Sequence, residues 1–208
     1  MIKNIKLGKR DMDMNFLAHL FLSGANEDIM LGNFLGDFIK GSDFNGFDPN
    51  IIKGIQLHRS IDYFTDHNEI TSKSKQRLTP KYRHYSSVII DIFYDHFLAK
   101  NWADYSNEEL QTFAKKVYTI IGKNKDILPE KALYVYPFMV KANWLYNYQF
   151  LEGVSNTLNG MAKRASFDSK MDEAIIELEE YYLDFENDFK EFFPTLQNHC
   201  KEFMRNND

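Results

Sequence analysis

Apolar residues recur at spacings of three and four along most of the chain, which is the period of an α-helix that buries one face. No segment sustains the alternation that marks a half-buried strand. Glycine and proline gather at 41–50, 79–80, 122–129 and 153–160, where we expect breaks. Between these breaks, segments with helical spacing cover 14–24, 27–40, 50–68, 83–101, 106–121, 130–150 and 168–193, the last continuing into 195–205.

These segments predict one compact all-α domain. A length of 208 residues fits a single domain, and neither an internal repeat nor a Ser/Gly/Pro-rich linker divides it. We expect the domain over 14–208, with residues 1–13 as an N-terminal extension. The basic and then apolar start resembles a signal peptide, but Asp11 and Asp13 at the junction and His19 in the apolar stretch argue against secretion.

The composition favours a folded chain with a sizeable core, since 44% of the residues are apolar and 15% are aromatic. A net charge of −5 gives no basic field, so we expect neither nucleic acid nor a membrane as a partner. No apolar run approaches the roughly 18–20 residues of a membrane-spanning helix. The single cysteine, Cys200, allows no internal disulfide, which predicts a reducing, cytoplasmic location. The sequence carries no signature of an oligomeric state.

The predicted helix 50–68 places ionisable groups among apolar ones. At 100° per residue, His58 and Asp62 fall within an arc of about 60° that also holds Ile51 and Ile55. A lone histidine there is often a hydrogen-bonded core residue. Burying a carboxylate, however, costs several kcal/mol unless the group is paired or metal-bound. The pair therefore predicts a site, with Arg59 pointing either to solvent or to the mouth of that site.

The predicted helix 83–101 repeats this pattern. Apolar side chains surround it, so we expect burial on nearly every side, yet it carries Asp91 and Asp95 one turn apart with His96 beside them. Two like charges at this spacing repel each other, more so when buried. A divalent cation would remove the conflict; a buried ion-pair network with Arg59 or Arg83 is the alternative.

Two further polar residues interrupt apolar segments near the start of the chain, His19 in MNFLAHLFL and Asp37 in GNFLGDF. Imidazole and carboxylate groups without thiolates suit Mn²⁺, Mg²⁺ or Fe²⁺ more than structural zinc. The spacing matches neither an EF-hand nor H-E-x-x-H, and no P-loop or dinucleotide fingerprint is present. Histidine and aspartate on several helices indicate a metal-assisted phosphohydrolase.

Several blocks of the sequence resemble the acyl-carrier-protein phosphodiesterase family. These blocks are MNFLAHLFLS at 14–23, GNFLGDFIKG at 32–41, GIQLHRSIDYFTD at 54–66, IDIFYDHFLAKNW at 90–102, NWLYNYQFLEGVSNTLNGMAKR at 143–164 and DFENDFKEFFP at 184–194. The resemblance implies an all-helical core like that of HD-type metal phosphohydrolases, dependence on Mn²⁺, and holo acyl carrier protein as the substrate. The chain has D-H at 95–96 where the HD superfamily has an adjacent H-D.

The resemblance places His19, Asp37, His58, Asp62, Asp91, Asp95 and His96 in the site, and we expect the following roles in that reaction. The metal would be held by His58, Asp62, Asp91, Asp95 and Asp37. His19 or His96 would donate a proton to the leaving serine oxygen. Arg59 would contact the phosphate, because a guanidinium matches its geometry.

An acidic carrier protein needs a basic surface on an enzyme that is itself acidic. We expect the segment 73–83 to be a loop at the rim of the site, since it holds five cations and no acid. The candidate residues for docking are Lys73, Lys75, Arg77, Lys81 and Arg83, with Arg164 as a further candidate. The alternative is an ordinary solvated loop.

Two other functions stay open at the level of the sequence. One is a helical metal phosphohydrolase that acts on another phosphoester, such as a nucleotide. The other is a non-enzymatic interaction protein whose histidine and aspartate residues form buried ion-pair networks.

Overall fold

A computed structural model describes residues 16–207, all of whose regular secondary structure is helical. This confirms the all-α prediction, while the predicted extension 1–13 lies outside the described residues. The α-helices of the described residues are α1 (Leu17–Leu22), α2 (Glu27–Gly36), α3 (Pro49–His67), α4 (Glu69–Tyr82), α5 (Ser86–Lys100), α6 (Leu110–Lys123), α7 (Glu130–Lys141), α8 (Trp144–Asn147), α9 (Leu151–Arg164), α10 (Ile175–Glu180) and α11 (Tyr182–Asn206). Short 3₁₀ turns lie at Arg83–Tyr85, Trp102–Asp104, Lys125–Ile127 and Met171–Glu173. No described helix is long and apolar enough to cross a membrane.

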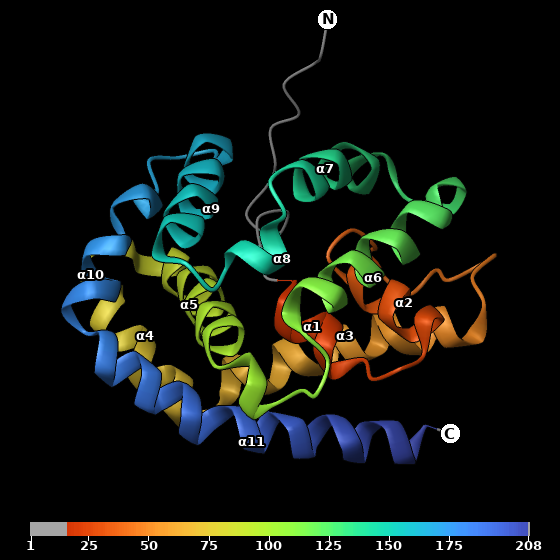
Figure 1. Cartoon of the computed structure of the whole chain (residues 1–208), viewed down its shortest axis with the longest axis horizontal. Helices are drawn as coiled ribbons and strands as arrows, with labels where there is room; N and C mark the ends of the chain where they lie inside the picture. Colours follow the sequence, from red (N-terminus) through yellow and green to blue (C-terminus); the bar gives the residue numbers. More distant parts are fainter. Residues whose placement is uncertain (1–15, 208) are drawn as a thin grey trace, which may run out of the picture.

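Helix α5 lies in the centre of the molecule, and α11 runs along one side of it (Figure 1). Most of α5 is buried, as its apolar surround predicts. Helices α1, α4, α9 and α11 all contact it. On the α11 side the core is aromatic, because Phe185, Phe189, Phe192 and Phe193 pack inward. The resulting layer supports α3 and α5 from the same side.

Helices α2 and α3 approach each other so closely that only glycine fits at their crossing. A Cβ on Gly32 would lie 2.0 Å from the carbonyl oxygen of Ile51, and one on Gly54 would lie 2.1 Å from that of Ile29. Side chains cannot be accommodated at such distances, so the two backbones touch. The crossing fixes the residues that follow on α2 against the second half of α3.

Residues 69–82 form helix α4, so the expectation of a loop over 73–83 is wrong. The Asn68 side chain caps the helix by accepting a hydrogen bond from the Ile70 backbone N–H. Its buried face consists of Thr71, Ser74, Leu78 and Tyr82, at helical spacing, and two of these four residues are polar. Because the polar residues interrupt the apolar spacing, the sequence did not predict this helix.

Other predicted boundaries also need correction. No break occurs at 153–160, because α9 runs through it. Helix α11 continues through Pro194, where the sequence suggests an interruption. The segment 130–150 is divided into α7 and α8 at Asn143, whose φ of 45° is left-handed.

Candidate metal centre

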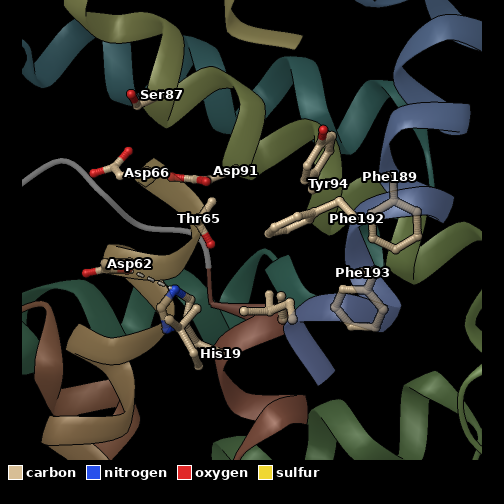
Figure 2. Close-up of a pocket in the computed structure, with 13 residues that line it drawn as sticks. His19, Asp62, Thr65, Asp66, Ser87, Asp91, Tyr94, Phe189, Phe192 and Phe193 are labelled. Carbon is tan, nitrogen blue, oxygen red and sulfur yellow. Dashed lines mark ion pairs between the residues drawn. The ribbon is translucent and has the colours of Figure 1, made fainter. Parts of the chain in front are cut away.

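Helices α1, α2 and α3 bring two histidines and two aspartates together. His19 Nε2 lies 3.3 Å from one carboxylate oxygen of Asp62, and His58 Nε2 lies 3.3 Å from the other. His58 Nε2 is also 3.4 Å from Asp37 Oδ1. The histidines and Asp37 are buried, whereas the Asp62 side chain is 50% exposed. Figure 2 shows His19 and Asp62 facing each other at the edge of a pocket.

Asn33 on α2 orients both histidine rings and was missed in the sequence. Its Oδ1 lies 3.0 Å from His19 Nδ1 and 3.1 Å from His58 Nδ1. Its Nδ2 donates to the His19 carbonyl oxygen and to Ser23 Oγ, which fixes the amide with its oxygen toward the rings. Both Nδ1 atoms therefore carry a proton, and Nε2 is the atom that offers a lone pair when the ring is neutral. The signal that could have identified Asn33 in the sequence is a polar residue inside an otherwise apolar segment.

Burial and neighbouring charges shift the pKa values of His58, Asp62 and Asp37. Burial opposes protonation of His58, but the carboxylates of Asp62 and Asp37 outweigh it and raise the pKa of His58 to about 10. Burial acts to raise the pKa of Asp62, but His58 and His19 hold it well below its usual range. Burial raises the pKa of Asp37, whose Oδ2 is enclosed and has no hydrogen-bond partner among the described residues.

The donor set fits a divalent metal ion. One atom each of His19, His58 and Asp62 can be chosen so that all three lie within 4.8 Å of one another. The partnerless oxygen of Asp37 lies on a carboxylate that already contacts His58. A buried carboxylate oxygen without a partner is costly, and a cation would satisfy it. We call His19, His58, Asp62 and Asp37 the ligand-like group. His19, which the sequence suggests as a proton donor, thus lies within it.

The predicted ligands Asp91 and Asp95 do not lie in this group. Asp95 is fully buried, and its two oxygens accept hydrogen bonds from the backbone N–H groups of Leu17 (2.9 Å) and Ala18 (2.8 Å) at the start of α1. Burial raises the pKa of Asp95 to about 6, although these two bonds lower it in part. Asp95 therefore anchors the short helix that carries His19. Asp91 lines a pocket that His19 and Asp62 also line.

His96 and Arg59 have different surroundings from each other. His96 is 2% exposed, and its Nδ1 and Nε2 lie 2.7 Å from the Tyr148 carbonyl oxygen and the Tyr182 hydroxyl. The structure does not bring it to the ligand-like group.

Arg59 donates to the Ile39 carbonyl oxygen at 3.0 Å and lies over the Phe44 ring. It borders the site directly.

Two pockets meet at Asp62. The outer pocket, about 550 Å³, is lined by Gly36, Asp37 and residues 39–42 together with His58, Arg59 and Asp62. The inner pocket, about 100 Å³, lies among α1, α3, α5 and α11, and Figure 2 shows His19 and Asp62 on one side of it and the phenylalanines of α11 on the other. Its lining includes His19, Asp62, Thr65, Asp66, Ser87, Asp91, Tyr94, Phe189 and Phe192. A ligand held at Asp62 can therefore extend to either side.

Most of the predicted docking cations have acid partners. Lys73 and Arg77 both contact the buried Asp188, at 2.9 Å and 2.6 Å. Lys81 pairs with Glu173 and Glu177, and Lys75 pairs with Asp66. These contacts connect α4 with α11, with the segment 173–177 and with the end of α3.

Arg83 and Arg164 differ from the other predicted docking cations. Neither has an acid partner among the described residues. Arg83 is exposed at the end of α4, with a φ of 53°. Arg164 closes α9 with an enclosed Nε that makes no hydrogen bond to the described part of the chain.

Comparison with known proteins gives a consistent result. The profile of the family described as acyl carrier protein phosphodiesterase matches residues 14–196. A Photorhabdus laumondii protein named acyl carrier protein phosphodiesterase is 31% identical over 184 residues, covering 88% of this chain and 93% of that protein. Proteins of the same name from Shigella boydii and Escherichia coli O157:H7 are 30% and 29% identical, each covering 88% of this chain and 95% of its own length. No solved structure matches the chain significantly.

Proposed function

The chain belongs to the acyl carrier protein phosphodiesterase family, and we propose that it hydrolyses holo acyl carrier protein to the apo protein and 4′-phosphopantetheine. The observation that carries this proposal is the group of His19, His58 and Asp62, at the junction of two pockets, in a member of that family. In metal-assisted phosphodiester hydrolysis a cation polarises the phosphoryl oxygens and activates a water, and this donor set suits the binding of such a cation.

We propose a divalent metal ion as the cofactor, with Mn²⁺ first and Mg²⁺ or Fe²⁺ as the alternatives. The ligands would be His19, His58 and Asp62, with Asp37 as a fourth. Nitrogen and oxygen donors without sulfur support this choice of ions. When bound, such an ion polarises a phosphoryl oxygen and lowers the pKa of a coordinated water.

The residues around the ligand group support the binding of a phosphate. Arg59 lines the outer pocket beside His58 and Asp62, and its guanidinium can contact non-bridging oxygens. Lys40 lines the same pocket. Asp95 would act by holding α1 in place, and we propose the same kind of structural role for His96 rather than proton donation, because both its ring nitrogens already have partners.

For docking of the acidic carrier protein we propose Arg83 and Arg164 ahead of the other cations. Lys73, Arg77 and Lys81 already have acid partners, which lowers the charge that they offer to a second protein. We further propose a cytoplasmic location, which the free and buried thiol of Cys200 supports.

Intact-mass measurement of holo carrier protein after incubation with the chain and Mn²⁺ tests the proposed function. We expect loss of the mass of the prosthetic arm, and no loss with Asp62→Asn. Asp126→Asn, an exposed aspartate of a 3₁₀ turn remote in sequence from the ligand group, is the matched control and should retain activity. Release of phosphate from nucleotides, with holo carrier protein left intact, would instead support a nucleotide phosphohydrolase.

A further inference from the structure

The inner pocket has an apolar base that begins at the ligand-like group. Tyr94, Phe189 and Phe192 line it and are at most 5% exposed. Figure 2 shows these rings across the pocket from His19 and Asp62. Because His19 and Asp62 line this pocket as well, a group bound to the ligand atoms has direct access to the apolar base.

The remaining polar lining of the inner pocket consists of oxygen atoms. Thr65, Asp66, Ser87 and Asp91 contribute hydroxyl and carboxylate groups, and no Lys or Arg is among the lining residues. Carboxylates accept hydrogen bonds and repel anions. The pocket therefore favours a neutral group with an apolar body and O–H or N–H donors, and it disfavours a second phosphate or an acidic protein surface.

The outer pocket differs because cations are among its lining residues. Arg59 and Lys40 line it beside Asp37 and Asp62, and its volume of about 550 Å³ is several times that of the inner pocket. It therefore suits the anionic and bulky half of a phosphodiester. The two halves of the holo carrier protein differ in this way: an acidic protein lies on one side of the phosphate, and a neutral, branched arm with a hydroxyl and amides lies on the other.

We propose that the inner pocket binds the pantoyl segment of the arm, which follows the phosphate directly, and that the carrier protein approaches through the outer pocket. This assignment rests on the proposed function. The dimethyl carbon would contact Phe192 and Tyr94, while the neighbouring hydroxyl would donate to the carboxylates at the rim. A cavity of about 150 Å³ accommodates benzene. A space of about 100 Å³ therefore fits a few carbon atoms and leaves the rest of the arm outside.

Binding of pantetheine, which carries neither phosphate nor protein, tests the assignment without turnover. Saturation-transfer NMR on the metal-free chain should detect binding to the wild type. Ser87 is half-buried in the lining, so Ser87→Phe should fill the pocket and weaken pantetheine binding at least tenfold. The same variant should raise the KM for holo carrier protein by a similar factor. Its affinity for Mn²⁺ should stay within twofold of wild type, which shows that the ligand group is intact.

A second variant avoids the risk that Ser87→Phe disturbs the fold. Thr65→Val keeps the volume and removes one hydroxyl from the rim, and we expect pantetheine binding to weaken about fivefold. Unchanged pantetheine binding in both variants, with arm release by the wild type, overturns the pocket assignment and leaves the proposed function standing. Failure of the wild type to release the arm overturns the proposed function. In that case, weaker pantetheine binding in both variants would still support the inner pocket as a binding site.

Discussion

The imidazole rings of His19 and His58 have their centroids 4.3 Å apart, although they belong to different helices. Asn33, on a third helix, accepts a hydrogen bond from each ring. The direction of both Nε2 lone pairs thus depends on one amide oxygen. The candidate metal centre is a product of the packing of three helices.

Replacing Asn33 with Ala should weaken Mn²⁺ binding by about 10–100-fold, because both histidines lose the group that fixes their orientation. Isothermal titration calorimetry measures the affinity. Ser23→Ala is the matched control, since it removes only one contact of the Asn33 amide and should have a smaller effect. Equal affinities for wild type and Asn33→Ala would contradict the orienting role.

Gly36→Ala should displace His58. A Cβ at this position would lie 2.2 Å from Cγ of the His58 ring, so the ring must leave the position in which it contacts Asp62 and Asp37. We expect at least a tenfold loss of Mn²⁺ affinity by calorimetry. Gly160→Ala, also in a helix, is the control: its Cβ would meet only Arg164 at 3.6 Å, and metal binding should be unchanged. Full affinity in Gly36→Ala would show that the site tolerates a shifted ring.

Metal binding should release about one proton from His58 at neutral pH. The carboxylates of Asp62 and Asp37 raise the pKa of His58 to about 10, so its ring is protonated before the ion binds. At pH values below this pKa, the apparent affinity for Mn²⁺ should rise by up to tenfold for each unit by which the pH is raised. In the metal-free chain, the stability of the fold changes with pH in the opposite direction. The contribution of charged His58 to the free energy of unfolding is complete below about pH 6.5 and is lost as pH rises through 10.

Calorimetry in two buffers of different ionisation enthalpy, between pH 6.5 and 8.5, counts the protons released. A value near zero at pH 7 would mean that His58 is already neutral and would contradict the charge assignment. His58→Gln should abolish most of the release.

Asp188→Ala should lower the free energy of unfolding by about 3 kcal/mol, because it leaves Arg77 and Ser74 without their buried acceptor. Urea denaturation followed by circular dichroism measures the change. Lys75→Ala breaks the pair with the exposed Asp66 and should cost less than about 1 kcal/mol. Similar costs for the two variants would mean that Asp188 does not hold α4 against α11.

The period of the apolar residues predicted a helical chain, and the polar interruptions predicted four members of the candidate site: His19, Asp37, His58 and Asp62. The helical chain is confirmed, and the structure places these four side chains beside one another. A histidine and a carboxylate one turn apart share a face in any helix. The family resemblance in the blocks at 14–23, 32–41 and 54–66 pointed to the same residues.

Only the tertiary structure decided which of the polar residues meet. Asp91 and Asp95 lie one turn apart just as His58 and Asp62 do, yet Asp95 accepts hydrogen bonds from the start of α1 and Asp91 lines the inner pocket. Asn33 carries no charge and was therefore not selected from the sequence, and its role arises because α1 and α3 both pack against α2. Periodicity determines the face of a helix on which a residue lies. The partner of that face is set by packing between helices distant in sequence.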